Sequence, residues 1–157
     1  MRGFTLIELI ACIAIIAVLA ALAGPRFVGT QSFDERGYAD ELAAALRYAE
    51  GVAVATGCNV SFTVTAAGPT AGYDALQQTA VGNTCAAAGP YTQQVMRADG
   101  TALSGTPPVD ATVAVGGTIV FGATGGIVSA PPVSSFSIGP DALTITVDAA
   151  SGVITGP

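Results

Sequence analysis

The longest apolar run of this 157-residue chain lies near its amino terminus. Residues 4–23 read FTLIELIACIAIIAVLAALA, and Glu8 is the only charged side chain among them. A helix of this length is ~30 Å long, which matches the hydrocarbon core of a bilayer. The pattern therefore predicts a membrane-spanning helix over residues 4–24. Gly24 and Pro25 then predict a kink, because proline donates no helical N–H and clashes with the preceding turn.

A second helical pattern follows a short polar stretch. Residues 32–35 (SFDE) have the form of a capping box at a helix N-terminus. The apolar positions beyond it recur at steps of three and four, the period of one helical face. They are Ala39, Leu42, Leu46, Ala49 and Ala53. We predict an amphipathic helix in residues 25–57 that packs under its own domain and stops at Gly57; the alternative is a helix that binds a partner.

The rest of the chain has the pattern of short strands joined by turns. Residues 59–65 alternate between apolar and polar, and residues 91–97 form a second candidate strand that ends at Asp99-Gly100, a dipeptide typical of hairpins. Segments 121–128 and 147–154 share one turn pattern, which predicts two hairpins with five-residue turns. The strand order within 66–117 stays open. These patterns predict an α+β fold, in which a long N-terminal helix packs on an antiparallel β-rich head over residues 58–157.

Composition excludes much chemistry. The chain has no His, Lys or Trp, which removes histidine-dependent nucleophiles, ordinary zinc sites, the Walker loop and Schiff bases. We therefore expect no enzyme and no cofactor. The net charge of -6 offers no basic surface for nucleic acid, so we expect no such partner.

Three interpretations compete for residues 4–23. A plain transmembrane anchor explains the length but gives no role to Glu8, although a carboxylate costs roughly 3 kcal/mol near the centre of a bilayer. A cleaved secretory signal explains Ala21-Leu22-Ala23, which has the small-x-small form of a signal peptidase site, but the charged region before it is short.

The third interpretation begins at Met1-Arg2-Gly3, which is followed by Phe4-Thr5-Leu6-Ile7-Glu8. This run resembles the amino-terminal signal of type IV pilins and pseudopilins. The resemblance implies that residues 1–3 are a leader, that prepilin peptidase cuts between Gly3 and Phe4, and that the new amine of Phe4 is methylated. The apolar helix would then be retained as the assembly helix.

This third interpretation also gives Glu8 a role. The resemblance implies that its carboxylate meets the amine of Phe4, on its own or a neighbouring chain, during assembly. An acid in apolar surroundings is less unfavourable when it is paired, and the pair would set the axial register between subunits.

The head contributes a weaker resemblance. A strand ending in Phe121-x-x-x-Gly125, followed by a closing pair of strands, resembles the GspH/FimT group of minor pilins. Residues 32–42 (SFDERGYADEL) and 46–49 (LRYA) are also similar to the mannose-sensitive haemagglutinin type of pilus subunit. The resemblance implies a single-pass inner-membrane protein with a periplasmic head that joins a pilus or a type II secretion pseudopilus. Its partners would be prepilin peptidase, other pilin subunits and the inner-membrane assembly platform.

Two alternatives remain open. One is a FimT-like minor pilin that serves as a DNA receptor, which the acidic balance disfavours. The other is a secreted or anchored β-rich protein with a cleaved signal peptide, which includes an enzyme that uses carboxylates alone, such as a glycosidase. Two acids converging in a cleft would support such an enzyme.

The resemblance places the head in an oxidising compartment, where disulfides persist. We therefore expect a bond between Cys58 and Cys85, the two cysteines of the head; the alternative is two free buried thiols. Cys12 is expected to be a small apolar residue of the first helix. Asp141 and Asp148 lack the acidic cluster of a calcium site, so we expect turn residues there and no metal.

Overall fold

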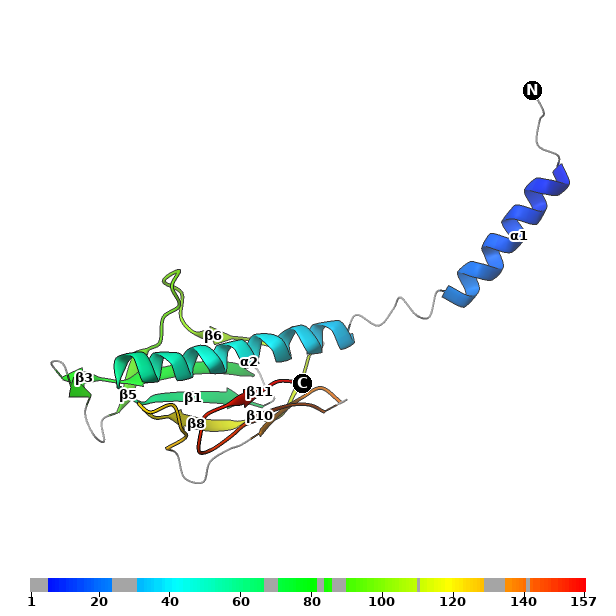
Figure 1. Ribbon diagram of the computed structural model, residues 1–157. Coiled ribbons are helices and arrows are strands. Elements are labelled where there is room, and N and C mark those ends of the chain that lie inside the picture. The colour runs from blue at the N-terminus through cyan, green and yellow to red at the C-terminus, as the bar shows by residue number, and fades with distance from the viewer. Residues whose placement is uncertain are drawn as a thin grey trace. The chain divides into compact units, whose positions relative to one another are not determined.

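The computed structural model describes residues 6–23, 31–66, 71–81, 84–85, 90–109, 111–128, 135–140 and 142–157. The chain divides into two compact units, Met1–Phe33 and Asp34–Pro157. Helix α1 spans Leu6–Ala23 within the first unit. The second unit contains all of the described strands, and helix α2 runs along them (Figure 1).

Helix α2 spans Gln31–Thr56 and packs on the strands with the predicted apolar stripe. Leu42 and Leu46 are fully buried, as are the alanines of that stripe. The helix ends where predicted, because Gly57 adopts a φ of 69° and donates its N–H to Ala53 O at 3.0 Å. Its start is one residue earlier than the Ser32 cap that the sequence favours, since Gln31 is already helical.

The described strands form two larger sheets and one small one. The first sheet has the order β5-β2-β1-β8, and β6 also pairs with β2. Its strands are β1 (Val60–Thr65), β2 (Gly72–Gln78), β5 (Tyr91–Gln94), β6 (Ser104–Gly105) and β8 (Gly117–Phe121). The second sheet has the order β11-β10-β9-β7. Its strands are β7 (Val113–Val115), β9 (Ser135–Ile138), β10 (Leu143–Val147) and β11 (Ile154–Thr155). The small sheet pairs β3 (Ala80–Val81) with β4 (Thr84–Cys85).

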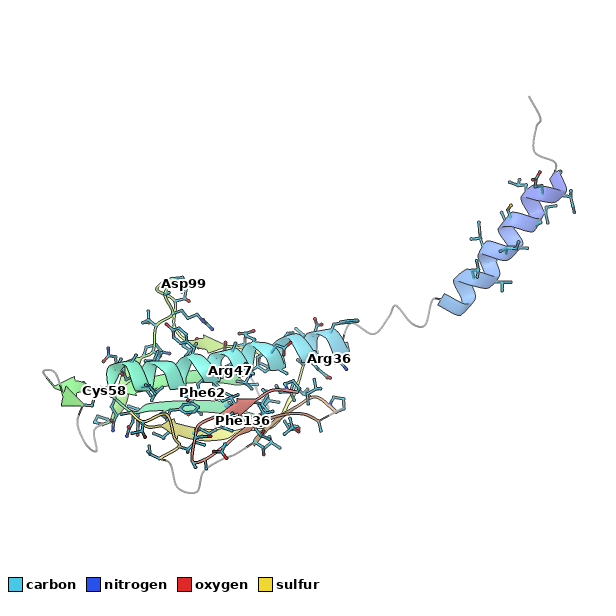
Figure 2. All side chains as sticks on the ribbon, viewed as in Figure 1. Arg36, Arg47, Cys58, Phe62, Asp99 and Phe136 are labelled. Carbon is cyan, nitrogen blue, oxygen red and sulfur yellow. A yellow bond between two sulfur atoms is a disulfide. The ribbon has the colours of Figure 1, made fainter. Side chains whose placement is uncertain are left out.

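The hydrophobic core joins α2 to both larger sheets. Phe62 of β1 and Phe136 of β9 are fully buried and belong to the same cluster as Leu42 (Figure 2). Phe62 also stacks on Tyr73 of β2, with ring centroids 5.5 Å apart. The paired strands are antiparallel in both larger sheets, so the predicted α+β fold with a helix on an antiparallel head is confirmed.

The predicted hairpins near the carboxyl end are also confirmed. Phe121 bridges Ile127 in the first, and Val147 pairs with Ile154 in the second. The first loop has the predicted five residues, 122–126, whereas the second is one residue longer than predicted and encloses 148–153. The two turns contact each other, since Ile127 N donates to Ala149 O at 3.0 Å.

Strand β2 is the longest of the described strands that the sequence pattern did not predict. It lies in the interior of the first sheet, between β1 and β5. Its sequence, GYDALQQ, contains no β-branched residue and three polar side chains, so it lacks the usual composition of a strand. Tertiary pairing therefore determines its conformation.

Candidate functional site

Helix α1 presents apolar side chains to its surroundings on every side. Their exposed fractions in the described part of the helix run from 47% at Ile10 to 77% at Leu6. Glu8 lies in the first turn, where a carboxylate interacts favourably with the helix dipole. Cys12 is an exposed free thiol. Within the residues that the structure describes, no helix combines the length and the apolarity needed to cross a membrane.

The processing residues and the predicted kink lie outside the described part of the chain. These are Gly3 and Phe4 at the proposed cleavage point and Gly24 and Pro25 at the proposed kink. Asp141, weighed as a calcium ligand, also lies outside it. Asp148 is described, and its Oδ1 accepts hydrogen bonds from the N–H and the hydroxyl of Ser151 in its own turn.

The structure joins Cys58 and Cys85 in the predicted disulfide. Cys58 follows the end of α2 and is 4% exposed, and its N–H donates to Thr56 Oγ1 at 3.3 Å. Cys85 lies on β4. The bond therefore links the junction between α2 and β1 to the small β3–β4 sheet (Figure 2).

A polar network that sequence patterns did not reveal ties α2 to the first sheet. Tyr73 of β2 donates its hydroxyl proton to Glu41 Oε1 at 2.6 Å and accepts from Arg97 Nη2 at 2.9 Å. Burial raises the pKa of Tyr73, and the hydrogen bond to Glu41 raises it further. The three residues come from distant parts of the chain, so no spacing in the sequence connects them.

Arg97 also fixes the turn formed by residues 96–102, which we call the 96–102 turn. Its Nη1 donates to Ala102 O at 2.7 Å, and its backbone N–H donates to Thr101 O at 2.7 Å. Tyr48 of α2 donates its hydroxyl proton to Met96 O at 2.9 Å. Asp99 stands at the tip of this turn, away from the sheet (Figure 2). Hydrogen bonds from the hydroxyl and N–H of Thr101 lower the pKa of Asp99.

A groove of about 250 Å³ lies between α2 and the 96–102 turn. Ala44, Ala45 and Leu103 give it largely apolar walls, and Glu41 and Arg97 also line it. Glu41 is the one acid among the described residues that line the groove, so no pair of acids converges there on a substrate. Glu41 and Arg97 both bond to Tyr73. In the described ranges, no three His, Cys, Asp or Glu residues gather closely enough to hold a metal ion.

Two acidic side chains of α2 lie against glycines of the β turns. Glu35 is 2% exposed, and a Cβ built on Gly139 would lie 2.4 Å from its Oε2. Glu50 Oε1 would lie 3.3 Å from a Cβ on Gly125 and 3.1 Å from one on Gly152. Burial raises the pKa of Glu50. Glycine thus allows each turn to approach a carboxylate of the helix.

Comparisons with known protein families give two matches. A family model described as the prokaryotic N-terminal methylation motif matches residues 1–24. A model described as type II transport protein GspH matches residues 38–152, which is well over half of the chain. No curated protein and no solved structure matches the chain.

Proposed function

The chain belongs to the GspH family of type II transport proteins, and from this premise we propose that it is a minor pilin or pseudopilin. It acts as a structural subunit of a type IV pilus or a type II secretion pseudopilus. The single observation that carries this function is the pairing of a methylation motif at residues 1–24 with a GspH head at residues 38–152. The haemagglutinin-pilus subtype stays a prediction, because neither match distinguishes it.

The precursor is processed at its amino terminus. Prepilin peptidase cuts between Gly3 and Phe4 and the new amine is methylated, a step that the match to the methylation motif supports. The apolar helix remains after the cut. It anchors the chain in the inner membrane by a single pass, with the head in the periplasm. The exposed apolar side chains of α1 support this, since an exposed apolar surface of that kind needs lipid or protein to cover it.

Assembly then exchanges lipid for neighbouring subunits around the apolar helix. The partners are other pilin-like subunits and the inner-membrane assembly platform. Glu8 pairs with the amine of Phe4 and sets the register between subunits, because an acid in apolar surroundings is costly until it is neutralised. The role is structural and not catalytic, which the absence of His and Lys supports.

Mass spectrometry of the mature amino terminus tests this function. We expect the protein purified from its native membrane to lack Met1–Gly3 and to carry one added methyl group on Phe4. A mature chain that begins at Gly24 would overturn the proposal, because the apolar helix would then be a discarded secretory signal. A chain that retains Met1 without methylation would also contradict it.

Glu8→Ala tests the role of the acid separately from processing. We expect this variant to insert and to lose Met1–Gly3 like the wild type, but to enter sheared filaments poorly, because the amine of Phe4 lacks its counter-charge. Immunoblots of the filament and membrane fractions measure how much of the protein is assembled and how much stays in the membrane. Ile7→Ala, a neutral change in the same turn, is the matched control and should assemble. Normal assembly of Glu8→Ala would remove the register role while leaving the proposed processing intact.

A further inference from the structure

The two cysteines of the disulfide differ in accessibility. Cys58 is 4% exposed, whereas Cys85 is partly exposed on β4. A thiol that attacks the folded head therefore has easier access to the sulfur of Cys85. Accessibility is one of the factors that decide which sulfur of a disulfide is attacked.

The surroundings of Cys58 hold it in place. Thr56 Oγ1 accepts hydrogen bonds from the N–H of Cys58 and from Nε2 of the buried Gln77. The next residue, Asn59, exchanges bonds with Gln78: its N–H donates to Gln78 Oε1 at 3.3 Å, and its carbonyl accepts from Gln78 N at 3.0 Å. Cys58 is therefore fixed between the end of α2 and the first sheet.

The second cysteine, Cys85, lies in the small β3–β4 sheet. Strand β4 pairs only with β3 among the described strands, through Ala80 opposite Cys85 and Val81 opposite Thr84. Among the described strands, β4 is therefore outside the two larger sheets that carry the core.

We propose that Cys85 is the cysteine through which the folded head exchanges with a thiol–disulfide oxidoreductase, and that Cys58 is the resolving cysteine. This assignment does not depend on the proposed function, because it rests only on the burial and pairing of the two cysteines. It gives the head a defined entry point for the enzyme that forms or breaks its disulfide.

The exchange balances in both directions. In reduction, the thiolate of the partner attacks Cys85 Sγ, a mixed disulfide forms there, and the bond to Cys58 breaks. The electron pair leaves on Cys58 Sγ, which takes a proton from solvent. The partner's second thiol then attacks the mixed disulfide, so that the partner is oxidised by two electrons and Cys85 leaves as a thiol. Oxidation of the head by a disulfide-bonded partner is the reverse sequence.

Glutathione tests the assignment on the oxidised full-length protein in detergent. Cys12→Ala removes the free thiol of α1 from all samples. The oxidised protein is treated briefly with reduced glutathione and quenched in acid, and free thiols are alkylated before peptide mass spectrometry. We expect about tenfold more glutathione on Cys85 than on Cys58, since access controls the rate. Equal labelling, or an excess on Cys58, would overturn the proposal.

Single-cysteine variants provide an independent measurement with oxidised glutathione. In the Cys12→Ala background, Cys58→Ser retains Cys85, and Cys85→Ser retains Cys58. We expect the mixed disulfide to form about tenfold faster in Cys58→Ser, and the two rates to converge in concentrated guanidinium, where burial is lost. Equal rates in buffer with both variants folded by circular dichroism would contradict the proposal. If a variant proves unfolded, the peptide map of the wild-type disulfide decides.

Discussion

At the residue scale, Gly139 shows how one glycine permits a close approach between helix and turn. Its φ is 70°, and a Cβ there would lie 2.4 Å from Glu35 Oε2. We expect Gly139→Ala to lower the free energy of unfolding by about 2–4 kcal/mol, since it adds overpacking to a strained backbone. Urea denaturation of the full-length protein in detergent, followed by circular dichroism, measures this.

Gly51 provides the matched control for this substitution. It lies inside α2, and nothing is within 4 Å of a Cβ built on it. We expect Gly51→Ala to raise the free energy of unfolding by about 0.5–1 kcal/mol, because alanine loses less entropy in a helix. Equal stability of the two alanine variants would contradict the packing described at Gly139.

The raised pKa of Glu50 predicts how the stability of the folded head changes with pH. Burial raises its pKa above the usual 4.5. Protonation therefore favours the folded head, and this contribution is present at low pH and is lost as the pH rises through the folded-state pKa. We expect Glu50→Gln to have a higher Tm than the wild type at about pH 7 and to lose that advantage towards about pH 4. Thermal denaturation across this range measures the difference.

Asp148→Asn is the control of opposite sign for Glu50→Gln. Hydrogen bonds from the hydroxyl and N–H of Ser151 lower the pKa of Asp148. Its contribution is therefore present at neutral pH and is lost as the pH falls through the folded-state pKa. We expect Asp148→Asn to be less stable than the wild type at neutral pH, with a gap that closes in acid. The same pH trend in both variants would mean that the two carboxyl groups are not perturbed in the way described.

At the element scale, the success of sequence prediction depends on where each element finds its partners. Helix α2 was predictable because its buried stripe recurs along its own sequence, and β1 because its apolar and polar residues alternate. Strand β2 was not predictable. It buries Gln77 and Gln78, and the groups that bond to them belong to Thr56 and Asn59, before β1. A buried glutamine is acceptable only with such partners, and a local pattern cannot show them.

The candidate site also has one part that the sequence predicts and one part that it does not. The motif at residues 1–8 is contiguous, so the proposed roles of Gly3, Phe4 and Glu8 could be formulated from the sequence alone. The network of Glu41, Tyr73 and Arg97 could not, because it exists only once β2 and the 96–102 turn lie beside α2.

The same network predicts unequal roles for two tyrosines that connect α2 to its neighbours. Tyr73 is buried and bridges Glu41 and Arg97, whereas Tyr48 is 39% exposed and donates to one carbonyl. We expect Tyr73→Phe to lower the free energy of unfolding by about 1.5–3 kcal/mol and Tyr48→Phe by no more than about 1 kcal/mol, because bonds to charged groups are stronger. Urea denaturation of both variants measures this, and a larger loss in Tyr48→Phe would contradict it.

At the scale of the whole molecule, charge distinguishes a structural subunit from a DNA receptor. The chain carries five basic side chains and eleven acidic ones, a net charge of -6. Arg97 and Arg47 also donate to acceptors within the head. We expect the full-length protein in detergent not to retard duplex DNA in a gel at low salt, where phosphate contacts are strongest. A salt-sensitive shift would favour the DNA-receptor alternative.

The pairing of β1 with β8 places Val60 opposite Phe121, so the first sheet contains neighbouring strands that are far apart in the sequence. A growing polypeptide reaches Phe121 only late in its synthesis, and β1 lacks its second neighbour until then. The apolar amino-terminal segment leaves the ribosome well before Phe121 is synthesised. Under the proposed function, insertion of this segment into the inner membrane would therefore begin before β1 pairs with β8, while the head is still unfolded and able to pass through a protein-conducting channel.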